Sequence, residues 1–267
     1  MDRPRAWIFT LGTEVVSGLV VNTNAAFLGR RLVLMGFTVS GVVSLPDDVE
    51  AISSFLSYVL ERYEPDLVVT TGGLGPTYDD ITLKAVAKAL EKSLVLNEEA
   101  YAMVREKYLA RGYELTQERL KMAYLPEGAR PIPNPVGTAP GAFLRVGRTV
   151  VVCLPGVPRE MEEMWVNYVE PLIRGLAPAK VAEGSFTLVG VPEASLAPIL
   201  KKYTPMYPKV YVKSHPKGFE LDAPVLEIYI AVSAPTQEEA SRLLKEVCEE
   251  LALKATNIGG KLRDLRC

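Results

Sequence analysis

The sequence predicts an α/β protein in which helices cover both faces of a mostly parallel sheet, giving three α/β/α layers, with a second, smaller α+β domain after it. Within the first 90 residues, a short apolar run is followed three times by an amphipathic helical pattern. Successive βα units of this kind form a parallel sheet with right-handed crossovers. The helical pattern breaks at Arg174–Pro178, and further patterns then follow in the order β-α-β-β-α. We therefore expect two domains, residues 1–175 and residues 176–267.

The first two βα units follow directly from the N-terminus. Residues 5–11 predict a strand, and residues 22–35 predict an amphipathic helix with an Asn-Thr-Asn cap and Gly36 at its end. Residues 38–45 predict the second strand. Residues 46–59 predict a helix that Pro-Asp-Asp opens and that carries apolar residues at helical spacing.

The third unit contains a glycine loop between two predicted elements. Asp66–Thr70 is short and β-branched, as a buried parallel strand should be, and Ile81–Leu90 has helical spacing. Ligands of open α/β sheets bind at such junctions. Because Gly72, Gly73 and Gly75 lack Cβ atoms, their amides can approach an anion closely. We expect a phosphate group to bind there.

Two adjacent aspartates, Asp79 and Asp80, follow these glycines. Carboxylates repel a phosphate unless a divalent cation or a proton stands between them, so the pair indicates metal-assisted chemistry. A structural alternative stays open. Either aspartate can cap the next helix, which stabilises a protein by about 1 kcal/mol, and the glycines can form a plain tight turn.

Further polar residues are expected at the same edge of the sheet. Glu14, Asn24 and Asp47 lie near the carboxyl ends of the first two predicted strands, so they should lie close to Asp80. Carboxylates gathered at one edge are what a divalent metal needs. For Glu14 and Asp47 the alternative is loop solvation or helix capping.

The rest of the first domain contains two more stretches of interest. Residues 97–112 and 116–124 predict ordinary helices, and a Pro- and Gly-rich loop at 131–141, a candidate to close over a ligand, precedes strands at 142–146 and 149–154. A second strand-to-helix turn follows at Leu154–Met161, with backbone amides that can face an anion. Its helical apolar residues are expected to be core rather than a cofactor site: Met161, Met164 and Trp165.

The second domain carries no chemical motif. Its expected elements are strands at 185–191, 209–214 and 224–233 and helices at 193–202 and 236–252. From residue 176 onward, 12 Lys and Arg stand against 11 Asp and Glu, a balance of +1. We interpret this domain as structural, lining a cleft or making a dimer contact, and His215 within it as a surface or satisfied residue.

Composition excludes several classes of partner. Of 267 residues, 48% are hydrophobic, and 30 Lys and Arg against 32 Asp and Glu give a net charge of −2 without a basic run. Nucleic acid is therefore not expected as a partner. No apolar stretch approaches the roughly 20 residues of a spanning helix, so no membrane partner is expected. The N-terminus does not resemble a signal peptide, and we expect a cytoplasmic protein.

Cysteine and histidine usage narrows the chemistry. Cys153, Cys248 and Cys267 are odd in number and lack metal-ligand spacing, which is typical of a reducing compartment, and Cys153 is expected in the core. His215 is the only histidine, so any general base must be a carboxylate or a metal-bound hydroxide. Two Gln and six Asn against 20 Pro suggest a source from a hot environment.

These motifs carry a family resemblance. Residues 71–82 resemble the T-G-G-L-G-P-T-x-D-D-x-T signature of the N-terminal domain of the CinA family, a relative of the MogA/MoaB-type molybdopterin-binding domains. The shorter G-G-x-G…D-x-T pattern of those domains is also present, while Pro76 and Asp79 match CinA alone. Residues 12–24 are similar to G-x-E-L-L-x-G…N-T-N with Val-Val for the leucines, residues 134–143 to N-x-x-G-T-A-P-G-F with an extra alanine, and residues 154–158 to L-P-G-x-P.

The resemblance implies a metal-dependent ADP-ribose pyrophosphatase, which hydrolyses ADP-ribose to AMP and ribose 5-phosphate with Mg²⁺, Mn²⁺ or Co²⁺. Asp80 and Asp79 are its expected catalytic residues, and with Glu14 its metal ligands. The expected phosphate- and nucleotide-binding residues are Gly72, Gly73, Gly75, Thr77, Asn24, Asp47, Gly137, Thr138, Pro155, Gly156 and Pro158. The second domain resembles a KH-like module without the G-x-x-G loop that grips RNA, and a homodimer is implied. The amidase domain of longer CinA proteins is absent, so amidase activity is not expected.

Two alternatives remain. One is molybdopterin binding or adenylylation in molybdenum-cofactor synthesis, at the same edge of the fold and with the same Asp80. The other is a non-catalytic nucleotide-binding or scaffold protein whose acids are only helix caps. Residues 76–79, which replace the shorter molybdopterin-type loop, favour the hydrolase over the first alternative.

Overall fold

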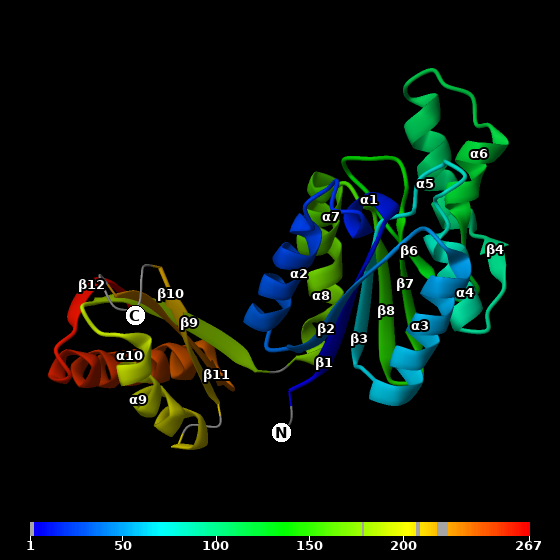
Figure 1. Cartoon of the computed structure of the whole chain (residues 1–267). Coiled ribbons are helices and arrows are strands. Elements are labelled where there is room, and N and C mark those ends of the chain that lie inside the picture. Colours follow the sequence, from blue (N-terminus) through cyan, green and yellow to red (C-terminus); the bar gives the residue numbers. More distant parts are fainter. Residues whose placement is uncertain (1–2, 178, 207–208, 218–223) are drawn as a thin grey trace. The chain divides into compact units, whose positions relative to one another are not determined.

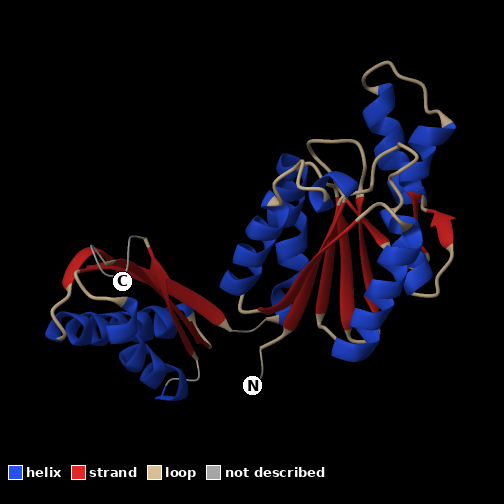
Figure 2. Cartoon of the chain, viewed as in Figure 1, coloured by secondary structure: helices blue, strands red, loops and turns tan. Residues whose placement is uncertain are grey.

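A computed structural model describes residues 3–177, 179–206, 209–217 and 224–267 (Figures 1 and 2). The chain divides into two compact units, residues 1–33 with 37–177 and residues 34–36 with 178–267. The division after Ala177 lies two residues beyond the predicted boundary.

Six strands form the sheet of the first unit, in the order β2-β1-β3-β8-β7-β6. In that order they are Thr38–Leu45, Arg5–Leu11, Leu67–Thr71, Thr149–Leu154, Gly141–Val146 and Arg130–Ile132. The first four run parallel, and β7 runs antiparallel to both β8 and β6. Every residue of β3 and β8 is buried, because these central strands are covered on both faces. The mostly parallel sheet is confirmed.

Helices cover both faces of this sheet, which confirms the three layers: α2, α7 and α8 lie on one face and α3 and α4 on the other (Figure 1). The helices are α1 (Thr13–Val16), α2 (Thr23–Leu34), α3 (Val49–Tyr63), α4 (Thr82–Ala89), α5 (Glu98–Leu109), α6 (Gln117–Leu120), α7 (Pro158–Met164) and α8 (Glu170–Ile173), with a π-helical turn at Trp165–Val169.

A partly buried ion pair holds α2 against α8. Arg31 donates Nε and a terminal nitrogen to the two carboxylate oxygens of Glu170 at 2.6 and 2.7 Å, and Trp165 donates Nε1 to the same carboxylate at 2.7 Å. Trp165, Met161 and Met164 are fully buried. Their assignment to the core is therefore confirmed.

Some short elements differ from the prediction. The helix expected at 116–124 is three pieces: α6, a 3₁₀ turn at Lys121–Ala123, and β5 (Tyr124–Pro126), which pairs with β4 (Leu94–Leu96). The expected loop at 131–141 begins within β6. Strands of three residues show no periodic pattern along the sequence, and only their partners reveal them.

The second unit is a four-stranded antiparallel sheet in the order β10-β11-β9-β12, with two helices. Its elements are β9 (Lys180–Val189), α9 (Glu193–Met206), β10 (Val210–Pro216), β11 (Val225–Ala234), α10 (Gln237–Asn257) and β12 (Lys261–Arg266). The separate α+β module is confirmed, while the last strand was not predicted. β12 carries four charged residues and its side chains are largely exposed, so it lacks the alternation that marks a strand.

A disulfide joins Cys248 of α10 to Cys267, 19 residues further along the chain. The expectation of unpaired cysteines is therefore wrong for these two, while Cys153 is free and buried as predicted. A bridge need not mean export, because intracellular proteins of hyperthermophiles also carry disulfides. The pairing agrees with the hypothesis of a hot environment.

Asp66 ties the starting ends of three strands of the first sheet. Its carboxylate accepts the Arg5 amide at 2.8 Å and the Arg148 guanidinium at 2.7 Å, and its backbone carbonyl accepts the Val150 amide at 3.0 Å. Burial raises the pKa of Asp66, but Arg148 and the Arg5 amide outweigh burial, so the pKa lies below its ordinary value.

We predict that Asp66→Asn lowers the free energy of unfolding at pH 7 by about 1 kcal/mol, the value of a charged hydrogen bond reduced for the solvent exposure of Arg148. Because folding lowers the pKa, this stability is present above the unfolded-state pKa of about 3.9 and is lost as pH falls through the folded-state value. Denaturant titrations at pH 7 and pH 2.5 should show the two proteins converging in acid. An equal gap at both values would contradict this account.

Candidate functional site

The glycine loop between β3 and α4 brings three strand ends together. Gly72 and Gly73 have positive φ angles of 104° and 65°, and a Cβ on Gly72 would overlap the carbonyl oxygen of Leu11 at the end of β1. The Gly72 amide donates to Leu154 O at the end of β8, at 3.0 Å. The Gly72 amide is thus used inside the fold, which corrects the expectation that it faces a ligand. The amides of Gly73 and Gly75 donate to no protein group in the described part of the chain.

Thr77 organises the two aspartates of the loop. Its amide donates to Asp80 Oδ2 at 2.8 Å, and its hydroxyl lies 2.6 Å from that oxygen and 2.5 Å from Asp79 Oδ1. A hydroxyl has one proton, so it serves the two carboxylates in turn. Lys121 Nζ donates to Thr77 O and fixes the turn from outside. The Thr77 hydrogen bond, the Asp79 amide and the charge of Lys121 lower the pKa of Asp79.

Neither aspartate caps α4. That helix begins at Thr82, and its N-cap residue, Ile81, makes no side-chain cap. Asp80 instead folds back over Gly75, where a Cβ would lie 2.6 Å from Asp80 Oδ2. The capping interpretation is therefore wrong for this pair. The two carboxylates are held at the loop for another reason.

The loops around Asp80 enclose a cavity of about 490 Å³. Its walls come from the segments that follow β1, β2, β3 and β8 and from the loop before β7. These loops lie at the carboxyl edge of the parallel strands (Figure 1), which is the position at which open α/β sheets bind ligands.

Ten of the predicted site residues line this cavity, and one unpredicted carboxylate, Glu160, joins them. The predicted ones are Glu14, Asp47, Gly72, Gly73, Gly75, Asp79, Asp80, Thr138, Pro155 and Gly156. The sequence predicted that these groups lie at one edge of the sheet, and the structure places them there.

Four of the predicted site residues do not line this cavity, and each makes a contact that supports the surrounding loops or helices. Thr77 holds the aspartates, and Gly137 is the near neighbour of Glu160. Asn24 is 8% exposed and donates Nδ2 to Gly156 O at 2.8 Å. Pro158 opens α7 at its first turn. Asn24 and Pro158 line a smaller cavity of about 70 Å³ that shares Glu14 and Gly156 with the larger one.

Asp47 lines the cavity and also joins two segments of the first unit through hydrogen bonds. Its Oδ2 accepts the amide and the hydroxyl of Thr13, both at 2.9 Å, and so ties the start of α1 to the end of β2. The capping alternative is wrong for Asp47, because the N-cap of the following helix, α3, is Asp48. The second oxygen of Asp47 remains available to the cavity.

Sequence reasoning missed the pairing of Asn134 with Glu160. Asn134 is 5% exposed; its Nδ2 donates to Glu160 Oε2 at 2.7 Å and to Ala139 O at 2.9 Å, and its Oδ1 accepts the Gly137 amide at 2.7 Å. Lys107 Nζ donates to the Asn134 carbonyl at 2.5 Å. This network folds the loop before β7 against α7 and sets Thr138 in the cavity wall. The adjacent N-x-x-G pattern was a signal for the loop, but nothing in the sequence pairs it with Glu160.

The described residues around the cavity do not form a complete set of protein ligands for a metal ion. Within the described ranges, no group of three or more His, Cys, Asp and Glu side chains is placed to hold one, so Asp80, Asp79 and Glu14 line one cavity without forming a three-ligand cluster. The arrangement does not suit zinc, which takes three or four protein ligands. It suits Mg²⁺, which commonly uses one or two carboxylates together with substrate phosphates.

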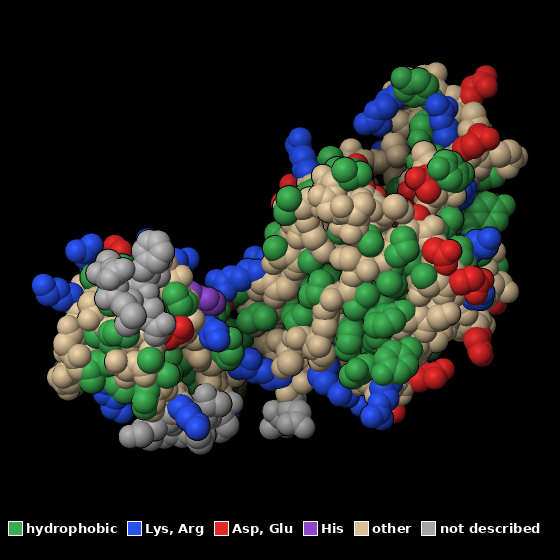
Figure 3. Space-filling view, in the orientation of Figure 1, with side chains coloured by type: hydrophobic (Ala, Val, Ile, Leu, Met, Phe, Trp, Pro, Cys, Tyr) green, Lys and Arg blue, Asp and Glu red, His purple; other side chains and the backbone are tan. Residues whose placement is uncertain are grey.

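Neither Cys153 nor His215 contributes to the cavity. Burial raises the pKa of Cys153 to about 11, so the thiol is neutral at physiological pH and inert. His215 is exposed on β10 of the second unit, and the only histidine is visible there in purple in Figure 3. The interpretation of His215 as a surface residue is confirmed.

Comparison with known proteins defines the class. Residues 7–175 match the family described as a probable molybdopterin binding domain, and the chain belongs to this family. Relatives extend over the full length: one from Pyrobaculum calidifontis is 50% identical over 95% of this chain and 98% of its own, and one from Aeropyrum pernix is 46% identical over 98% of each.

Within that class, the chain is CinA-like. A CinA protein of unknown function from Thermoplasma acidophilum is 42% identical to it, with a TM-score of 0.59, over 65% of this chain and 99% of the other. The resemblance drawn from the sequence motifs is therefore confirmed. In the part of the chain that the structure describes, no helix combines the length and apolarity needed to cross a membrane.

We predict that Asn134→Asp lowers the free energy of unfolding by about 2 kcal/mol, because it removes two buried hydrogen bonds and sets one carboxylate against another. Asn167→Asp is the matched control: Asn167 donates to Glu163 at 2.9 Å in the same chemical pairing, but on an exposed helix face, where the change should cost at most about 0.5 kcal/mol. Thermal and denaturant melts compare the two. Equal losses would show that the Asn134 network contributes nothing special.

Proposed function

We propose that this chain is a metal-dependent nucleotide diphosphate hydrolase of the ADP-ribose pyrophosphatase type, converting ADP-ribose to AMP and ribose 5-phosphate. One observation carries the proposal. Asp79 and Asp80 are fixed by Thr77 at the wall of a 490 Å³ cavity and serve no helix as caps.

The cavity offers groups for both ends of such a substrate. The free amides of Gly73 and Gly75, together with the Thr138 hydroxyl in the same wall, provide donors for phosphate oxygens. The volume lies within the range of roughly 300–1,000 Å³ that suits ligands of this size. Leu11, Leu74, Pro76 and Val157 supply apolar wall beside them.

A divalent cation would be held by Asp80 and Asp79, with Glu14 within the same wall. When bound, it neutralises phosphate charge and makes water a better nucleophile. The protein's part is to orient the carboxylates. Asp80 keeps Oδ2 on Thr77, which leaves Oδ1 for the cation or for a water proton. Water adds to one phosphorus, the bridging P–O bond breaks, and a carboxylate takes the proton, since this unit has no histidine.

Molybdopterin binding is the second candidate, favoured by the family match over residues 7–175. That ligand also carries a phosphate, so the same glycine amides serve it. The third candidate is a non-catalytic nucleotide-binding or scaffold protein; capping of α4 by Asp79 or Asp80 does not support it, because α4 has no side-chain cap. We further propose a cytoplasmic homodimer without a nucleic-acid partner. Light scattering tests the dimer, and salt-dependent RNA binding would contradict the last point.

We predict AMP release from ADP-ribose in the presence of Mg²⁺, Mn²⁺ or Co²⁺, and a fall in kcat/KM of about 10² or more in Asp80→Asn, equivalent to roughly 2.7 kcal/mol of transition-state stabilisation. Asp48→Asn is the matched control, because Asp48 caps α3 through a 2.7 Å bond from Ala51 and touches no part of the cavity. It should keep full activity and lose at most about 1 kcal/mol of stability.

Asp79→Asn separates the roles of the pair. If it alone is inactive, Asp79 rather than Asp80 is the essential carboxylate. If both variants hydrolyse ADP-ribose as fast as the wild type, the catalytic assignment is wrong. Binding of a molybdopterin species without hydrolysis of ADP-ribose would favour the second candidate.

Thr77→Val gives an independent prediction, because it keeps the shape of the side chain and removes the hydroxyl shared by the two carboxylates. We expect kcat to fall by about tenfold with KM nearly unchanged, as for a group that orients catalytic residues without binding substrate. Steady-state kinetics on ADP-ribose with excess Mg²⁺ measures the changes in kcat and in KM separately. A rise in KM alone would instead indicate that Thr77 contacts the substrate.

A further inference from the structure

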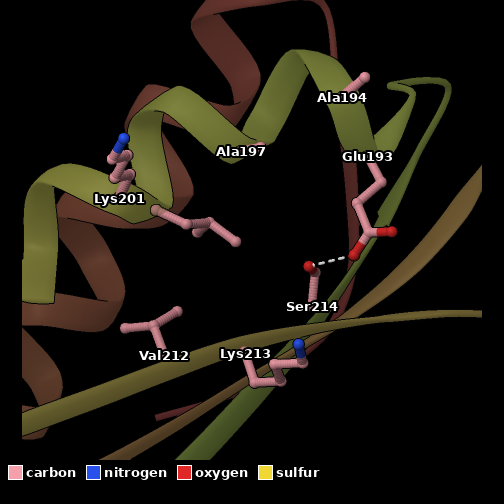
Figure 4. Close-up of a pocket in the computed structure, with 8 residues that line it drawn as sticks. Glu193, Ala194, Ala197, Lys201, Val212, Lys213 and Ser214 are labelled. Carbon is pink, nitrogen blue, oxygen red and sulfur yellow. Dashed lines mark hydrogen bonds between the residues drawn. The ribbon is translucent and has the colours of Figure 1, made fainter.

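The second unit has a groove of its own, between α9 and β10, with a volume of about 550 Å³. Figure 4 shows Ala197 and Lys201 on the helix side and Val212 and Lys213 on the strand side. One end carries a hydrogen bond from the Ser214 hydroxyl to Glu193 at 2.5 Å. Nothing in the proposed hydrolysis uses this groove.

The strand that lines the groove is an open edge. β10 stands at the end of the order β10-β11-β9-β12 and pairs, among the described strands, with β11 alone. In an antiparallel pair, alternate residues direct their N–H and C=O groups to the partner and the others direct theirs outward. The backbone amide of Ser233 donates to the backbone carbonyl of Lys209 at 3.0 Å, and the backbone amide of Lys217 donates to the carbonyl of Val225 at 2.8 Å.

Those two hydrogen bonds fix the alternation. Odd-numbered residues of β10 face β11, so Val212 and Ser214 direct their backbone N–H and C=O groups to the open side, next to the groove. An edge with free backbone groups beside a helix is the arrangement that binds an extended peptide as an added strand. Pro216 has no N–H and ends the pairing edge at the last residue of β10.

The charge of the groove indicates which kind of peptide it binds. Lys201 and Lys213 are exposed, and neither forms an ion pair with a described residue. They favour a peptide with acidic side chains. The same lysines oppose pairing of β10 with a second copy of itself, because an antiparallel pair centred on Lys213 would set two like charges opposite each other.

Nucleic acid fits this groove less well. Its walls are Ala194, Ala197, Leu200 and Val212 with the two lysines, Glu193 and Ser214. No aromatic side chain is among them, so bases have no surface to stack on.

We propose that the β10 edge and the α9 groove bind an extended acidic peptide segment of a partner protein by strand addition. Backbone groups of Val212 and Ser214 provide the hydrogen bonds. The apolar floor receives the side chains on the α9 face of the added strand, and Lys213, which lies on the opposite face of β10, pairs with the acidic side chains that alternate with them.

The test is an amide NMR titration of the full chain with a capped peptide of alternating glutamate and valine, six residues long. We expect shift changes centred on Val212 and Ser214. Lys213→Glu should weaken binding by about tenfold, as reversal of the charge in a partly exposed ion pair predicts. Lys261→Glu makes the same charge change at the other edge of the sheet, on β12, and should leave the affinity unchanged.

Two peptide controls complete the experiment. A peptide with lysine in place of glutamate should not bind, and one with N-methyl groups on alternate amides should lose binding if strand addition is the mode. Equal binding by the acidic and basic peptides, or shift changes away from β10, would overturn the proposal. So would binding of an oligouridine to the same amides while the acidic peptide fails, which would instead favour RNA.

Discussion

The close approach of three strand ends at Gly72 is the constraint on which the site depends. The Gly72 amide bonds the last residue of β8, and its α-carbon lies against the carbonyl that ends β1. A Cβ cannot fit at this position, and the positive φ angle disfavours other residues as well. Because β1, β3 and β8 meet so tightly, the loops that follow them converge on one cavity. Any side chain at this position would move those loops apart.

Above that junction, short polar contacts fix the loops without closing the cavity. Thr77 holds Asp79 and Asp80, Asp47 holds the start of α1, and Asn134 holds the loop before β7 against Glu160. In each of these contacts one oxygen of the carboxylate accepts the hydrogen bond, and the other oxygen is left to bind a ligand in the cavity. The wall therefore consists of preoriented acids and free amides, a combination that suits a phosphate ligand brought in with its own cation.

The second unit is held together differently. Its sheet is antiparallel, with β10 and β12 as its two edge strands, and its helices and strands share a buried apolar core of their own. The Cys248–Cys267 disulfide ties the segment after β12 to α10 and restricts the unfolded chain. On the β10 edge, Lys213 and Pro216 limit what can pair with it.

The sequence by itself determined the βα repeats, the bounds of β1 and β2, the position of the glycine loop and the edge of the sheet at which Glu14, Asp47 and Asp80 meet. These follow from local periodicity and from the rule that parallel strands share a carboxyl edge. The local sequence left open whether Asp80 caps α4 or turns back to Thr77, because a short polar loop offers both hydrogen-bond arrangements. Only the tertiary structure decided that Asn134 meets Glu160 from 26 residues away and that Cys248 pairs with Cys267. Contacts between distant residues leave no periodic trace in a single chain, so the sequence shows the groups while the fold decides which of them meet.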